Sequence, residues 1–104
     1  MLIVTTEMIS GRQIIETKGF VQGSTVRAKH IGRDIAASLK NLVGGELTGY
    51  TELLNESRQE AVDRMVQQAQ QLGANAIVCV RLSTSALTQQ ASEVLCYGTA
   101  VVVQ

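Results

Sequence analysis

Apolar residues recur at two different periods along this chain, and the change of period separates expected strands from expected helices. Residues 2–5 and 13–21 are short β-prone stretches, and Gly19 indicates a bulge or bend in the second one. Between Ile31 and Val43, apolar residues return every three or four positions. This spacing predicts a first helix, because it places the apolar side chains on one helical face.

A second and stronger helix is expected from about Tyr50 to Leu72. Its apolar residues form a single stripe with helical spacing. The stripe consists of Leu54, Ala61, Met65, Ala69 and Leu72. Gly44 and Gly45 separate the two expected helices, and Gly73 ends the second, since glycine readily takes the left-handed conformation that closes a helix.

The last third of the chain is expected to form a β-hairpin. Residues 76–82 and 93–103 are the two apolar strands, and the polar stretch 83–92 is their connection. The order strands, helix, helix, strand, strand predicts an α+β fold with two layers, an antiparallel sheet and helices on one face of it. The 104 residues fit one domain, 1–104.

Both alternating sets of side chains in the last strand are largely apolar. One set holds Val94, Cys96, Ala100 and Val102, and the other holds Leu95, Tyr97, Val101 and Val103. An antiparallel strand with one solvated face would alternate apolar and polar residues, so this sheet is expected to be covered on both faces. The helices of one small chain can cover only one face. The pattern therefore predicts a homo-oligomer.

The charge balance argues against a nucleic-acid partner. Nine basic and nine acidic side chains cancel, whereas nucleic-acid binders usually carry an excess of Lys and Arg to neutralise phosphates. No stretch approaches the roughly 20 apolar residues of a membrane helix. The N-terminal residues also lack the features of a signal peptide. We therefore expect a cytoplasmic protein without a nucleic-acid or membrane partner.

Several short blocks carry a resemblance to a known family. They are residues 41–45, Tyr50, residues 58–61, residues 73–76 and residues 97–101. Together they resemble the YbjQ-like family, small bacterial proteins of unassigned biochemical role that are sometimes labelled heavy-metal-binding. The resemblance runs nearly end to end. It implies a dodecin-like subunit that assembles as a pentameric ring, whereas the residues themselves argue only for more than one subunit.

Arg58 is the first candidate for a ligand-binding residue. It follows Leu54 by four positions and precedes Ala61 by three, which places it on the stripe expected to face the sheet. A buried arginine needs a carboxylate or an anionic ligand, and Asp34 on the first expected helix is the natural partner. Both residues also match positions of the resembled family. Two interpretations stay open: an ion pair between the helices, and an anion-binding arginine in a cleft between subunits.

Gly44, Gly45 and Tyr50 complete the candidate ligand site. A glycine-rich turn before a helix can hold phosphate through free backbone N–H groups. The lysine and hydroxyl residues of a true phosphate loop are absent, so the competing interpretation is that these glycines only end a helix. Tyr50 would pack its ring nearby and hydrogen-bond through its hydroxyl.

Cys79 and Cys96 are the candidate metal ligands. In the expected hairpin they lie roughly opposite one another, and two facing thiolates could form half of a zinc or copper(I) site. Their spacing matches no metal motif, and free cysteines are usually small apolar core residues. A purely structural role in the core is therefore the competing interpretation. His30, the only histidine, has no recognisable partner, and no cofactor can be assigned.

These observations predict a homo-oligomeric binding or scaffold module with a small-ligand site at subunit interfaces. The alternative is a heavy-metal-binding protein that uses Cys79 and Cys96. Analogy with dodecins also raises a bound flavin or nucleotide, but the low aromatic content, 3%, offers few stacking partners. No catalytic constellation is recognisable in the sequence, so we do not expect an enzyme.

Overall fold

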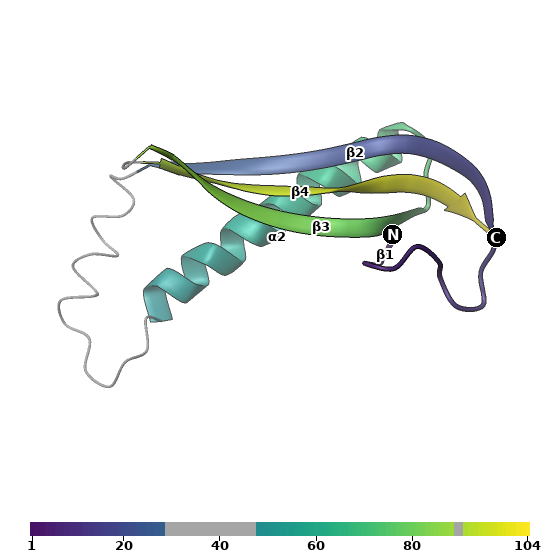
Figure 1. Ribbon diagram of the computed structural model, residues 1–104, viewed down its shortest axis with the longest axis horizontal. Coiled ribbons are helices and arrows are strands. Elements are labelled where there is room, and N and C mark those ends of the chain that lie inside the picture. Colours follow the sequence, from purple (N-terminus) through teal and green to yellow (C-terminus); the bar gives the residue numbers. More distant parts are fainter. Residues whose placement is uncertain (29–47, 89–90) are drawn as a thin grey trace.

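A computed structural model describes residues 1–28, 48–88 and 91–104 of the chain. In chain order, its elements are β1 (Leu2–Ile3), β2 (Ile14–Ala28), α2 (Thr48–Gln71), β3 (Ala76–Thr88) and β4 (Ala91–Val103). The described strands form one four-stranded sheet in the order β1-β3-β4-β2, and α2 lies along one face of it (Figure 1). The α+β class and the single helical layer agree with the sequence pattern.

The sheet differs from the expected one in direction and in strand length. β1 pairs with β3 in parallel, so the sheet is mixed, whereas a wholly antiparallel sheet was predicted. The predicted connection 83–92 was also wrong, because β3 continues to Thr88 and β4 begins at Ala91. The bulge expected at Gly19 is confirmed by a register shift between Thr17 and Gly19. The helix predicted at residues 31–43 lies outside the described residues.

The main core lies between α2 and the sheet. Its fully buried members are Val21, Ala61, Met65, Ala69, Ile77, Cys96 and Ala100. Helix and sheet approach closely at Gly23, where an added Cβ would lie 2.2 Å from the backbone oxygen of Ala61. Only glycine leaves room for the helix backbone at this point, so Gly23 sets the distance between the two layers.

A second, smaller cluster lies on the opposite face of the sheet, which we call the far face. It consists of Ala76, Val78, Val101 and Val103. Val4 and Ile9 of the N-terminal segment pack against it. The chain therefore covers this end of the far face itself, where the sequence pattern had been taken to require another subunit.

The rest of the far face is not covered by described residues. Phe20 is 63% exposed and Val26 is 53% exposed, although both lie in a strand of the sheet. The ring of Phe20 lies beside that of Tyr97, with a centroid distance of 6.4 Å. Apolar and aromatic side chains thus remain open to solvent beyond the N-terminal segment.

The connection from α2 to β3 explains the small residues of positions 73–76. Gly73 has a φ of 82°, in the left-handed region. Its N–H donates to the oxygen of Gln70 at 3.0 Å, and the N–H of Ala74 donates to the oxygen of Ala69 at 3.1 Å. These two bonds are the usual closure of a helix that ends in glycine.

Asn75 then extends the pairing of β3 with β4 through its side chain. Its amide nitrogen donates to the oxygen of Val103 at 2.9 Å, and its Oδ1 accepts from the Val103 N–H at 2.7 Å. The side-chain amide therefore bonds to β4 as a backbone peptide would.

In the part of the chain that is described, no helix is both long and apolar enough to span a membrane.

Candidate functional site

One flank of α2 reaches the outer edge of β2. Gln68 Oε1 accepts a hydrogen bond from the Gln22 N–H at 2.7 Å, and Arg64 donates from Nη1 to the oxygen of Ser24. Both backbone groups belong to an edge strand, where they would otherwise face solvent. The helix is therefore held over the β2 side of the sheet.

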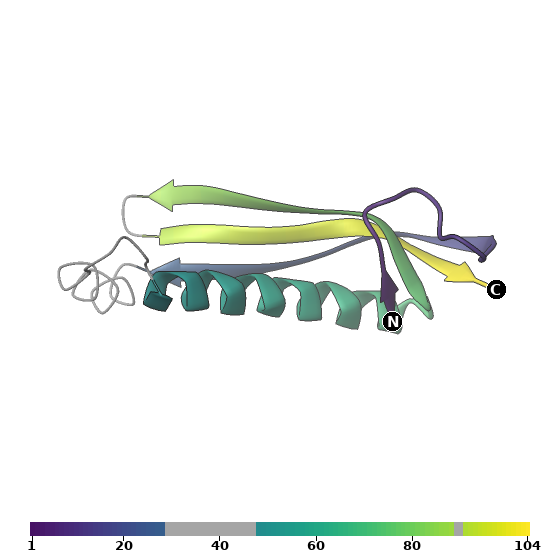
Figure 2. The same cartoon turned by 90° about the horizontal axis from the view of Figure 1, so that it is seen from below.

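The other flank of α2 lies next to a part of the sheet that no described residue covers. It carries Arg58, Val62 and Val66, of which the two valines pack against the edge of the main core. Figure 2 shows α2 alongside β2, whereas β3 begins near the end of the helix and then runs away from it. Leu82 of β3 lies opposite Cys96 in the pairing with β4, so it is on the helix side, yet it is 49% exposed. We call the surface formed by these four residues the open flank.

Arg58 does not face the sheet, and that prediction was wrong. The side chain is exposed, and its neighbour Ser57 is buried in the position assigned to it. The backbone oxygen of Ser57 accepts a hydrogen bond from Thr25 Oγ1 at 3.1 Å. A small residue fits here because helix and sheet are close. Asp34, the proposed partner of Arg58, lies outside the described residues.

The other candidate ligand residues are placed only in part. Tyr50 lies in the first turn of α2, and its side chain is outside the description. Gly44 and Gly45 also lie outside the described residues. The role of these three residues as a ligand site therefore stays a prediction.

The two cysteines lie on opposite faces of the sheet. Cys96 is buried in the main core against α2, whereas Cys79 packs on the cluster of the far face. The expectation that they face one another in the hairpin was wrong, because Cys96 pairs with Leu82 and a bulge between Val78 and Arg81 displaces Cys79. Cys79 takes a φ of 56° in this bulge.

Cys96 has the surroundings of a core residue. Its Sγ lies 3.5 Å from the Sδ of Met65, and both side chains are fully buried. Burial raises the pKa of the Cys96 thiol above its ordinary value, because an apolar environment disfavours the thiolate. A protonated thiol is a poor metal ligand and a poor nucleophile.

The described residues of one chain therefore do not fit a heavy-metal site. The two thiols are separated by the sheet, and no group of three or more His, Cys, Asp or Glu side chains is close enough to hold an ion within the described ranges. Soft ions such as zinc or copper(I) need two or more converging sulfur or nitrogen ligands.

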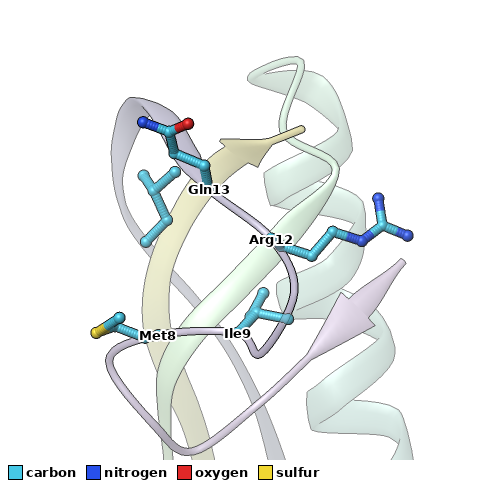
Figure 3. A pocket seen from close by; sticks show the side chains of 5 residues that line it. Met8, Ile9, Arg12 and Gln13 are labelled. Atoms are coloured by element: carbon cyan, nitrogen blue, oxygen red, sulfur yellow. The ribbon is translucent and has the colours of Figure 1, made fainter.

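A shallow hollow of about 250 Å³ lies where the N-terminal segment enters β2. It is lined by Met8, Ile9, Arg12, Gln13 and Ile14. The guanidinium of Arg12 points away from Met8 and Gln13, so these side chains do not converge on one point (Figure 3). The hollow thus offers apolar surface but no converging set of polar groups.

Arg81 is a residue whose role the sequence reasoning missed. Its Nη1 donates to the oxygen of Thr5 and to the oxygen of Val80, each at 2.8 Å. It therefore ties the N-terminal segment to β3. The signal for it was a single charged residue within the otherwise apolar stretch of residues 76–82.

Comparison with known proteins decides the family. A family model described as "Putative heavy-metal-binding" and labelled YbjQ matches residues 1–104. The chain belongs to the YbjQ family. A UPF0145 protein of Clostridioides difficile is 59% identical over 104 residues, which are 100% of this chain and 93% of that protein. A UPF0145 protein of Acinetobacter baylyi is 65% identical over 94 residues, which are 90% of this chain and 87% of that protein.

A solved structure supports the fold of this YbjQ protein. It is a crystal structure of a protein of unknown function from the DUF74 family of Pediococcus pentosaceus. It matches with a TM-score of 0.67 and covers 100% of this chain and 98% of that chain. At 18% sequence identity the match concerns the fold alone.

Proposed function

We propose that this YbjQ protein is a homo-oligomeric binding module with a small-ligand site at its subunit interfaces. The observation that carries the proposal is the exposure of apolar side chains on both faces of one sheet. Phe20 and Val26 are uncovered on the far face, and Leu82 is uncovered on the helix side. Sheet surfaces of this kind are usually buried in an interface.

A ring of copies is the assembly that we favour, and five is the number implied by the family resemblance. A head-to-tail contact closes into a ring when the rotation between neighbours fits a whole number of subunits. Such a contact would cover one subunit's exposed apolar surface with a different surface of the next subunit. We favour binding over catalysis because the open flank combines an arginine with three apolar side chains and offers no nucleophile among them.

Arg58 is the residue that we place in the ligand site. It is exposed beside the half-buried Val62 and Val66, so a neighbouring copy that packs on the open flank would enclose a guanidinium. An enclosed guanidinium attracts a carboxylate or phosphate and binds it in a fixed geometry. The expected ligand is therefore a small anion.

Native mass spectrometry of the untagged chain, purified without chelator or reductant, tests the assembly. A single oligomeric species is the expected result, and a stable monomer would overturn the proposal. The same spectrum shows any retained ion or organic molecule as added mass.

Thermal unfolding with inorganic phosphate as the probe tests the anion site. We expect phosphate to raise the melting temperature of the wild type and of Arg12→Ala, a control at an exposed arginine outside the open flank. Arg58→Ala should lose this shift while keeping its subunit number. If Arg58→Ala responds to phosphate as the wild type does, Arg58 is not the anion-binding residue.

A further inference from the structure

The N-terminal segment covers only the first part of the outer edge of β3. The Val4 N–H donates to the Ile77 oxygen at 3.0 Å, and the Val80 N–H donates to the Val4 oxygen at 3.1 Å. A third backbone bond joins the Cys79 N–H to the Thr6 oxygen at 3.0 Å. Beyond Val80, no backbone bond to the outer edge of β3 is recorded within the described ranges.

The hydrogen bonds of β2 fix which backbone groups point out of the sheet. In an antiparallel pair, a residue directs both its N–H and its C=O either toward the partner strand or away from it. Gln22 and Ser24 point away from β4, because their groups bond to side chains of α2. The intervening Gly23 therefore points toward β4, where its partner is Cys96.

The same alternation continues across β4 to β3. Because Cys96 is bonded to β2, its neighbours in β4, Leu95 and Tyr97, direct their backbone groups toward β3. Their partners there are Ser83 and Arg81. The groups that point outward from β3 are those of the residues in between. They belong to Leu82, Thr84 and Ala86, which we call the open edge.

The two outer edges of the sheet are treated differently. On β2, side chains of α2 bond to the outward groups of Gln22 and Ser24. The open edge has no such cover among the described residues, and its three side chains are exposed. Residues 82–88 also contain no charge and no proline, the usual devices that keep an edge strand from pairing with another chain.

We propose that the open edge of β3 is where an extended strand of a second copy of this chain adds to the sheet. The inference rests on the proposed function, since it assumes that copies assemble, and it names the surface through which they do. Such an added strand would satisfy the outward groups of Leu82, Thr84 and Ala86 and cover the exposed side chain of Leu82.

A second copy fits this edge better than an unrelated peptide. The edge lies beside apolar surface on the helix side of the sheet, which includes Leu82 and the half-buried Val62 and Val66. A transient peptide would leave the edge and this apolar surface uncovered whenever it dissociated. An uncovered edge strand without charges promotes aggregation. A permanent subunit covers them at all times. The segment 82–88 also carries no charge, so it would not repel a strand of another subunit through like charge.

Amide hydrogen exchange of the untagged wild type, at a concentration where native mass spectrometry gives the oligomer, tests the proposal. Ser83 and Ser85 serve as internal controls, because their N–H groups bond to β4 in every state. If the edge is paired, the amides of Leu82, Thr84 and Ala86 should also exchange at least about a hundredfold more slowly than free amides. An oligomer in which only the control amides are slow would overturn the proposal.

Thr84→Pro provides a second test, with Thr84→Val as the matched control. Proline at position 84 removes an outward N–H and leaves the bonds between β3 and β4 in place. We expect Thr84→Pro to lower the subunit number, whereas Thr84→Val should assemble as the wild type does. A folded Thr84→Pro that keeps the wild-type subunit number would overturn the proposal. If this variant does not fold, the hydrogen exchange of the wild type decides whether the open edge is paired.

The two proposals fail in different ways. A monomeric wild type contradicts the proposed function itself. An oligomer with fast exchange at the open edge contradicts only the assignment of this edge, and leaves assembly through other surfaces standing.

Discussion

Cys79 holds a backbone conformation that side chains rarely adopt. Its φ of 56° lies in the left-handed region, within the bulge that carries β3 from the pairing with β1 to the open edge. Glycine is the usual residue at such a position, because it has no Cβ to clash with the following carbonyl. The half-buried side chain of Cys79 gains some contacts with the cluster of the far face, which offset part of this strain.

This strain predicts an unusual order of stabilities at position 79. Cys79→Val adds apolar volume but should lower the free energy of unfolding by about 2 kcal/mol, because a β-branched residue is strained at positive φ. Cys79→Gly should stay within about 1 kcal/mol of the wild type, since relief of strain offsets lost contacts and a more flexible unfolded chain. Urea unfolding at matched concentration measures both. If Cys79→Val is more stable than the wild type, side-chain packing outweighs backbone strain at this position.

Cys96 makes stability depend on pH in the alkaline range. Its folded pKa is raised above the ordinary value of 9.0, so above this pH the unfolded chain loses the thiol proton while the folded chain keeps it. The unfolded state is thereby favoured. The contribution of the protonated thiol is complete below 9.0 and is lost as the pH rises toward the folded pKa.

We therefore expect the free energy of unfolding to fall with a limiting slope of about 1.4 kcal/mol for each pH unit from this group. The difference between the wild type and Cys96→Ala in urea unfolding, at neutral pH and at pH about 10, isolates the effect from other titrating groups. Parallel pH profiles of the two proteins would mean that the thiol is not held protonated by the fold.

The residues of α2 show what the sequence could and could not reveal at this scale. The apolar stripe predicted the buried face correctly at Ala61, Met65 and Ala69, but Leu72 at its end is 42% exposed. Ser57 was missed because a polar residue does not register as part of an apolar stripe, although it is small enough for the close contact with the sheet. Because Ser57 was missed, its place on the buried face was assigned to the neighbouring Arg58.

At the scale of elements, the spacing between helix and sheet depends on Gly23. Gly23→Ala would place a Cβ 2.2 Å from the Ala61 oxygen and 2.5 Å from the Met65 nitrogen. Neither backbone atom can move without shifting α2. We expect a loss of about 3 kcal/mol or more in the free energy of unfolding, at the upper end for overpacking.

Ser24→Ala is the control, since it lies one residue further along the same strand and points to the far face. It should change the free energy of unfolding by less than about 0.5 kcal/mol, as for most partly exposed positions. Denaturant unfolding of the two variants gives the comparison. Equal stabilities would mean that the helix can move away from the sheet at little cost.

Strand existence was readable from the sequence, whereas strand length and direction were not. Residues 83–88 are mostly small and polar, so they resemble a loop when considered alone. They are extended because five of these six residues pair with a residue of β4, such as Ser83 with Leu95 and Thr84 with Val94. The parallel partner of β1 is likewise fixed by a contact between residues more than seventy positions apart, Leu2 and Ala76.

At the scale of the whole molecule, Arg81 holds the N-terminal segment against the sheet. Arg81→Ala should remove the hydrogen bond to the Thr5 oxygen and lower the free energy of unfolding by about 1–3 kcal/mol, the range for a charged donor. The amide of Cys79, which donates to Thr6, should then exchange faster. Hydrogen exchange of Arg81→Ala and of the control Arg12→Ala measures this. Unchanged protection at Cys79 would show that the segment is held by its apolar contacts alone.

The strand order also sets when the sheet can form during synthesis. Among the described strands, β1 pairs only with β3 and β2 pairs only with β4, so the described residues before Ala76 form no strand pair with one another. A growing chain on the ribosome can thus form α2 early, but it must keep the apolar residues of β2 unpaired until the last third has been translated. A nascent chain stopped before Ala76 should show no protected strand amides, and its exposed β2 would make it a client for chaperones.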